Sequence, residues 1–264
     1  GNAISMQSGE LLSKLIIVCP MLFLAGFADS IAGGGGVISL PAFVFAGLPL
    51  HMAYGTNKFS MSLGTSVSAY KYYKAGHLRL GAALFAVGGA LIGANIGASL
   101  ALLVSEKYLS YILMVLLPIA AVFIMANRRF GESETIREIS KRKEYALSSL
   151  VGLFVGAYDG FFGPGAGMFY TLLFASLLGY SLLSASANAR VVNLASNVGA
   201  LFAFISGGKV LYAIGIPAAA CTILGNYLGA RLAIKNGARF IRPVMVAVIV
   251  LLILKLAADY IFIA

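Results

Sequence analysis

Two acidic and two basic residues lie inside apolar stretches of this sequence. Four consecutive glycines follow Asp29, and Lys58 comes after them; a second glycine-rich run lies between Asp159 and Arg190. A charge near the middle of a bilayer costs at least about 2.5 kcal/mol, so such residues normally face protein or a water-filled cavity. Because acid, glycine run and cation occur twice in the same order, we interpret them as parts of one binding site.

The glycine runs offer groups that bind anions. Glycine interrupts a helix, and the backbone amides at such a break can face a cavity. A short apolar segment follows each run, and it would begin with the positive end of its helix dipole beside the break. Helix N-termini with free N–H groups bind anions. We therefore expect substrate to contact the backbone of Gly34, Gly35, Gly165 and Gly167.

Polar side chains accompany both cations at helical spacing. Residues three, four, seven or eight positions apart share one face of a helix, so these hydroxyl and amide groups point where the cation points. Hydrogen bonding between helices is the alternative role for any single member of the set. The side chains predicted to bind substrate are Asn57, Lys58, Thr65, Arg190, Asn193 and Asn197.

Asp29 and Asp159 have two candidate roles that the sequence alone leaves open. One is structural, because pairing with Lys58 and Arg190, or capping the glycine turn, would neutralise a buried charge. The other is carrying a coupling proton, because a buried carboxylate can exchange protons near neutral pH. We slightly favour the structural role.

The composition bounds the class of protein. With 60% hydrophobic and 11% charged residues among 264, we predict an all-α polytopic membrane protein. The formal net charge of +10 does not indicate nucleic acid here, because the cations lie between apolar runs and act as topology signals. Cys19 and Cys221 are not in equivalent positions, which argues against a disulfide or metal pair, and no P-loop is present. We expect no metal, no cofactor and no enzymatic activity.

The spacing of these residues indicates an internal duplication of the sequence. Asp29 and Asp159 are 130 residues apart, and Lys58 and Arg190 are 132 apart, as are later pairs of glycines. We predict an N-terminal repeat at 6–127, a basic linker at 128–143 and a C-terminal repeat at 144–264. The expected helical segments are 11–31, 35–48, 51–73, 79–104, 108–127, 144–162, 166–179, 182–206, 210–233 and 240–262.

Five segments per repeat would invert the second copy relative to the first. This arrangement puts most loop cations, including those of the central loop, on the cytoplasmic side and both termini outside, as the positive-inside rule requires. Segments 35–48 and 166–179 are too short to cross a bilayer, so we expect half-helices completed by the unwound glycines. The alternative is that both re-enter, leaving four plus four spans in parallel repeats.

Several motifs resemble the TauE/SafE family of membrane proteins. They are GFADSIAGGGG and GAYDGFFGPGAG, the GTNK segment, and SANARVVNLASN, which together extend the resemblance over nearly the whole chain. The resemblance implies export of sulfite or related sulfur-containing anions and organosulfonates across the bacterial cytoplasmic membrane. That substrate class agrees with an anion cavity that contains Lys58 and Arg190.

We therefore predict a secondary anion transporter, an exporter in the sulfite and organosulfonate class, that works by alternating access at a central cationic site. Its partners would be a small anion, the lipid bilayer and a candidate coupling proton. An anion channel using the same cavity is one alternative. The other is an intramembrane aspartyl protease using Asp29 and Asp159, but no GxGD sequence is present and that chemistry gives no use for two buried cations.

Overall fold

The computed structural model describes residues 8–109, 111–112, 139–241, 243–248 and 250. In this part of the chain the regular structure is helical throughout, as predicted. Most of the expected segment 108–127 and of the linker 128–143 lies outside the described residues, as does much of 240–262. The main helices are α1 (Ser8–Ala32), α2 (Gly35–Phe45), α3 (Leu50–Lys74), α4 (Leu80–Leu103), α6 (Lys141–Phe161), α7 (Ala166–Leu178), α8 (Leu182–Ser206) and α9 (Tyr212–Asn236).

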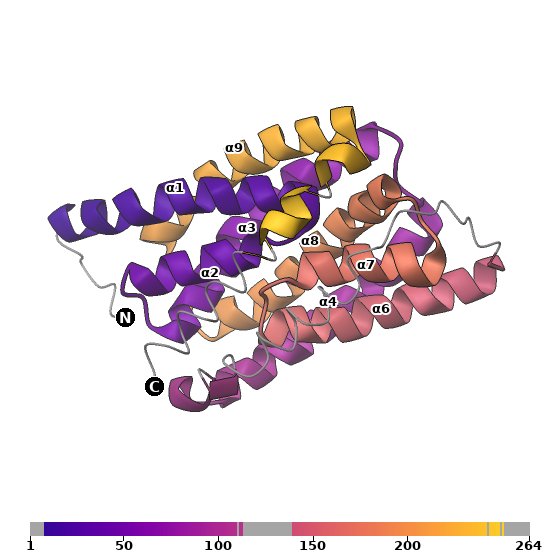
Figure 1. Cartoon of the computed structure of the whole chain (residues 1–264). Helices are drawn as coiled ribbons and strands as arrows, with labels where there is room; N and C mark the ends of the chain where they lie inside the picture. The colour runs from indigo at the N-terminus through magenta and orange to yellow at the C-terminus, as the bar shows by residue number, and fades with distance from the viewer. Residues whose placement is uncertain (1–7, 110, 113–138, 242, 249, 251–264) are drawn as a thin grey trace.

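Helices from the two halves of the sequence pack on one another rather than forming separate bundles (Figure 1). α1 packs along α9, and α4 packs along α6, which makes two outer pairs. α3 and α8 lie between these pairs with the short helices α2 and α7. The contacts follow a matching pattern in the two halves: α1 packs on α9 as α6 packs on α4, and α3 packs on α8 and α9 as α8 packs on α3 and α4.

Four of the described helices have the length and apolar composition that crossing a membrane requires: α1, α4, α8 and α9. By contrast, α2 has 11 residues and α7 has 13. At 1.5 Å per residue they reach about 17 and 20 Å, well short of the roughly 30 Å hydrocarbon layer. Both are half-helices that follow the glycine breaks.

Small residues bring the outer helix pairs into close contact. A Cβ atom added to Gly93 on α4 would overlap the carbonyl oxygen of Leu153 on α6, and one added to Gly160 would overlap that of Ala94. Gly225 on α9 has the same relation to Phe23 on α1. Backbones that approach this closely pack well without bulky side chains between them.

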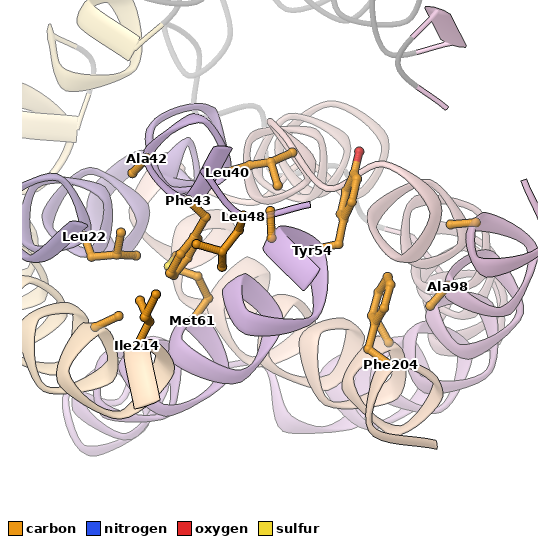
Figure 2. Packing of buried hydrophobic residues seen from close by; sticks show 14 of the residues in the cluster. Leu22, Leu40, Ala42, Phe43, Leu48, Tyr54, Met61, Ala98, Phe204 and Ile214 are labelled. Carbon is orange, nitrogen blue, oxygen red and sulfur yellow. The ribbon is translucent and has the colours of Figure 1, made fainter. Parts of the chain in front are cut away.

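A buried apolar cluster joins the helices around one half-helix (Figure 2). Phe43 of α2 is fully buried among side chains that include Leu22 of α1, Met61 of α3 and Ile214 of α9. This packing fixes the position of α2, and therefore of the glycine break at its start, relative to both halves.

Candidate functional site

The two glycine breaks are sharp turns of the backbone. Gly33 has φ 85°, Gly163 has φ 94° and Gly165 has φ 81°. These values lie in the left-handed region, which glycine adopts without the steric cost that a Cβ imposes. The amide of Gly33 donates to the carbonyl oxygen of Asp29 at 2.8 Å, which closes the last turn of α1 directly before the first break.

The two breaks also lie against each other. A Cβ added to Gly167 would lie 2.7 Å from the Cα of Gly33, and one added to Gly33 would overlap the backbone of Gly167. Glycine is therefore required on both sides of the contact. The start of α2 and the start of α7 consequently meet at the centre of the protein.

Lys58 of α3 forms a buried ion pair with Asp159 of α6. The distance from Lys58 Nζ to Asp159 Oδ1 is 2.8 Å, and the two residues are 1% and 3% exposed. Lys58 Nζ also donates to Asn197 Oδ1 at 3.0 Å, and Ser196 Oγ donates to Asp159 Oδ2 at 2.5 Å. Both charges are thus partnered, as buried charges must be.

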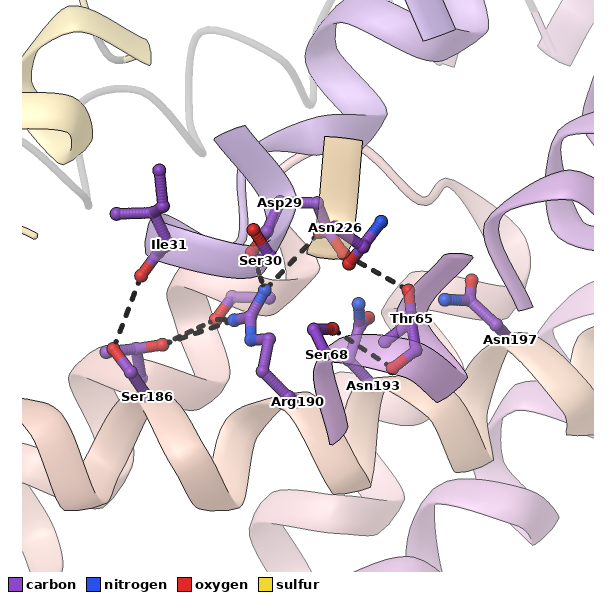
Figure 3. A network of polar contacts seen from close by, with 12 residues as sticks. Asp29, Ser30, Ile31, Thr65, Ser68, Ser186, Arg190, Asn193, Asn197 and Asn226 are labelled. Carbon is purple, nitrogen blue, oxygen red and sulfur yellow. Dashed lines mark hydrogen bonds and ion pairs between the residues drawn. The ribbon is translucent and has the colours of Figure 1, made fainter. Parts of the chain in front are cut away.

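Arg190 of α8 forms the second buried ion pair, with Asp29, and also binds the backbone at the helix breaks (Figure 3). Its Nη1 lies 3.4 Å from Asp29 Oδ1 and donates to the Asp29 carbonyl oxygen, while its Nη2 donates to the Gly167 carbonyl oxygen at 3.1 Å. Thr65 Oγ1 donates to Asp29 Oδ2 at 3.2 Å. One guanidinium therefore ties the end of α1 to the start of α7, an arrangement that uses its planar set of donors.

Each ion pair joins one half of the chain to the other. The acid of the first half, Asp29, pairs with the cation of the second, Arg190, and Asp159 pairs with Lys58. Removing one member of such a pair leaves an uncompensated buried charge, which costs about 3–5 kcal/mol. Each half thus supplies the counter-ion that the other half needs.

A cavity of about 20 Å³ lies where the half-helices meet. Lys58 Nζ and the Asp159 carboxylate border it, and Asn57 Oδ1 has no hydrogen-bond partner among the described residues. This volume is close to that of a single water molecule. The residues that line the cavity are Asp29, Gly33, Gly36, Asn57, Lys58, Met61, Asp159, Gly163, Gly167, Asn193 and Asn197.

Comparison with known proteins identifies the family. The model of the family described as sulfite exporter TauE/SafE matches residues 18–256. This chain belongs to the TauE/SafE family. It is 37% identical over 261 residues to the probable membrane transporter protein YfcA of Escherichia coli K12, covering 98% of this chain and 94% of that one. It is 36% identical to the probable membrane transporter protein ORF9 of Sinorhizobium sp over 237 residues, which are 90% of each chain.

A more distant TauE/SafE relative carries a substrate in its name. The sulfite exporter TauE/SafE family protein 3 of Arabidopsis thaliana is 32% identical over 92 residues, which cover 34% of this chain and 19% of that protein. No solved structure gives a significant match to this chain. The relatives therefore identify a multi-pass membrane transporter of the TauE/SafE family without fixing the transported molecule.

Only part of the residue set predicted for this TauE/SafE chain borders the cavity. The predicted residues that do so are Asp29, Asn57, Lys58, Asp159, Gly167, Asn193 and Asn197. Those outside its lining are Gly34, Gly35, Thr65, Gly165 and Arg190. Gly35 lies against the Cβ of Asp29, and Gly34 faces Met168 and Val248 instead. The two cations therefore do not converge on the cavity. Lys58 borders it, while Arg190 binds the backbone of Asp29 and Gly167, which line it.

The sequence did not predict several residues that line the cavity or bind its lining residues. Gly33, Gly36 and Gly163 belong to the glycine runs that were singled out, so a broader assignment of those runs would have included them. Ser196 lies three residues after Asn193 on the same helix face, and its hydroxyl also donates to the Asn193 carbonyl oxygen at 3.0 Å. Met61 is apolar in an apolar helix, so its type gives no signal.

Proposed function

We propose that this protein is a secondary transporter that exports a small sulfur-containing anion, of the sulfite or organosulfonate class, across the cytoplasmic membrane. The observation that carries the proposal is the buried ammonium group of Lys58 beside the cavity at the two helix breaks. The family description and the name of the Arabidopsis relative supply the sulfur-containing class.

An anion at this site would take the place of the Asp159 carboxylate as the partner of Lys58. Lys58 Nζ is held by the Asp159 carboxylate at 2.8 Å, and a substrate oxyanion is an equivalent partner for the ammonium. The amide groups of Asn57, Asn193 and Asn197 and the backbone at Gly33 and Gly167 provide the remaining polar surface. The substrate thus competes with Asp159 for Lys58, and the displaced carboxylate keeps its hydrogen bond from Ser196.

The size of the cavity favours a carrier over an open channel. A space of about 20 Å³ holds about one water molecule, so an anion as large as sulfite requires α2 and α7 to move apart. Rocking of two inverted repeats about the breaks would open the site to one side at a time. In Figure 1, α3 and α8 run in opposite directions, which supports this inversion.

The orientation in the membrane follows from the positive-inside rule. The ends of α3 and α9 that carry Lys71, Lys74, Arg231 and Lys235 lie together, and Arg79 and the start of α6 lie at that same end of the molecule. We assign this end, with the central basic loop, to the cytoplasm and both termini to the outside.

The contacts of the aspartates favour the structural role for Asp29, which accepts hydrogen bonds from Arg190 and Thr65. Asp159 is the candidate for proton coupling, because it borders the cavity and must part from Lys58 when the anion binds. The pairing of each carboxylate with its own cation weighs against an aspartyl protease, whose two aspartates must share a proton.

Binding and flux test the proposal. Purified protein should gain thermal stability with sulfite or a small sulfonate, because a ligand that binds only the folded state stabilises it. Proteoliposomes should take up labelled sulfite, and Lys58→Ala should abolish that uptake. The control is Lys14→Ala, which removes a partly exposed cation of α1 that pairs with Glu10 at 2.8 Å. Unchanged sulfite flux in a folded Lys58→Ala protein would refute the site, and stabilisation by none of the anions would refute the substrate class.

A further inference from the structure

A second candidate site lies in a groove between α3 and α9. The groove has a volume of about 590 Å³ and is formed by the last turns of both helices. Its residues on α9 recur at intervals of four, at Tyr227, Arg231 and Lys235, so their side chains share one face of the helix. α3 contributes Lys71 and Lys74 on the opposite wall. One helix comes from each half of the chain.

The groove is strongly cationic. Four basic side chains and no acidic one line it, and none of the four forms an ion pair within the part of the chain that the structure describes. Like charges gathered on one surface repel one another, and an anionic partner would relieve that repulsion. The lining cations are Lys71, Lys74, Arg231 and Lys235.

Aromatic and aliphatic groups make the rest of the groove. Lys71 Nζ lies 3.7 Å from the centre of the Tyr227 ring, and Lys74 Nζ lies 5.4 Å from that of Tyr70. These contacts hold the ammonium groups beside the groove. Val67, one turn before Lys71, adds apolar surface deeper in the bundle, and Ile234 adds apolar surface beside Lys235 at the end of α9. A ligand that fits has a compact anionic head and an apolar tail.

We propose that the α3–α9 groove is a binding site for an anionic phospholipid of the phosphatidylglycerol class. The phosphate would lie among the lysines and Arg231, as basic pockets between transmembrane helices bind lipid head groups, and the first carbons of the acyl chains would follow Val67 and the ring of Tyr227. The tyrosines suit the same depth, because their rings favour the boundary between head groups and hydrocarbon. A bound lipid would hold α3, which carries Lys58, against α9 at the end of the bundle.

The test compares lipids and variants by native mass spectrometry in neutral detergent. The ligands are dioctanoyl phosphatidylglycerol, dioctanoyl phosphatidylcholine and glycerol 3-phosphate. The groove variant is Lys74→Gln/Arg231→Gln. The control variant is Lys141→Gln/Lys143→Gln, which removes two exposed cations of α6 outside the groove and at the same end of the molecule.

Wild-type protein should bind one phosphatidylglycerol at a much lower lipid concentration than it needs to bind phosphatidylcholine. Each cation near an anionic lipid contributes about a fivefold gain in affinity, so the groove variant should bind about 30-fold more weakly and the control variant should match wild type. Equal affinity for the two lipids would overturn the proposal, and so would equal phosphatidylglycerol binding by both variants. Displacement of the lipid by equimolar glycerol 3-phosphate would also overturn it, because the site would then take soluble phosphates. All four mutated positions are exposed, so both variants are expected to fold.

Discussion

Variants of Lys58 can show whether this residue is needed for stability, for transport, or for both. Lys58→Met removes the ammonium that lies 2.8 Å from Asp159 Oδ1 and keeps a side chain of similar length. The Asp159 carboxylate, 3% exposed, then retains Ser196 as a hydrogen-bond donor but has no counter-ion. Breaking a buried pair from one side costs about 3–5 kcal/mol, so we expect Lys58→Met to lower the free energy of unfolding by that amount.

Neutralising both partners should restore most of this loss. In Lys58→Met/Asp159→Asn no buried charge is left unpaired, and the asparagine can still accept the hydrogen bond from Ser196. Replacing a whole buried pair by neutral groups is often close to neutral for stability. The double variant should therefore be more stable than Lys58→Met, yet transport no anion, because the ammonium beside the cavity is gone.

Unfolding by denaturant in detergent, followed by circular dichroism, measures these differences. The control is Arg79→Gln, which breaks a pair with Glu144 at 3.8 Å in which the arginine side chain is 52% exposed. The Glu144 side chain is 15% exposed and keeps the hydrogen bond that Tyr180 Oη donates, so loss of the half-exposed arginine should cost about 1 kcal/mol, well below the loss expected for Lys58→Met. A double variant less stable than Lys58→Met would contradict the pairing, and sulfite transport by the double variant would contradict the role of Lys58.

Three further changes test other parts of the account. Arg190→Lys should lower the free energy of unfolding by about 1–3 kcal/mol, because a single ammonium cannot satisfy both backbone carbonyl oxygens that the guanidinium contacts; equal denaturant midpoints would contradict this. Gly93→Ala should cost about 1–3 kcal/mol by forcing α4 from α6, whereas Gly88→Ala, which meets no atom within 4 Å, should be neutral or stabilising by up to about 1 kcal/mol; the same effect at both positions would refute the close packing. Asn57→Asp should abolish sulfite uptake, since it adds a negative charge to the cavity lining, while Asn57→Ala should retain part of it; faster uptake by Asn57→Asp would indicate a cationic substrate.

The sequence identified the location of the site because burying charge in a membrane is costly. Asp29, Lys58, Asp159 and Arg190 stood out by type alone, and their repetition marked the two glycine breaks as equivalent. The half-helices followed from segment length, because about fourteen residues cannot cross the hydrocarbon. These inferences need only local chemistry and chain length, which one sequence contains.

The pairing between the halves could not be obtained in the same way. A repeat alignment says that Asp29 corresponds to Asp159, but not that each faces the cation of the opposite half. That depends on how α1 packs along α9 and α4 along α6, which is a property of the whole bundle. For the same reason Arg190, which looks equivalent to Lys58 in sequence, holds the backbone of the breaks, while Lys58 borders the cavity.

The most direct test of the central claim is a structure of the protein bound to selenite, a sulfite analogue whose selenium atom can be located by anomalous scattering. The account predicts selenium in the cavity between the starts of α2 and α7, with a selenite oxygen about 3 Å from Lys58 Nζ and the Asp159 carboxylate displaced from that ammonium. Selenite bound elsewhere in the protein, with Lys58 and Asp159 still paired, would contradict it.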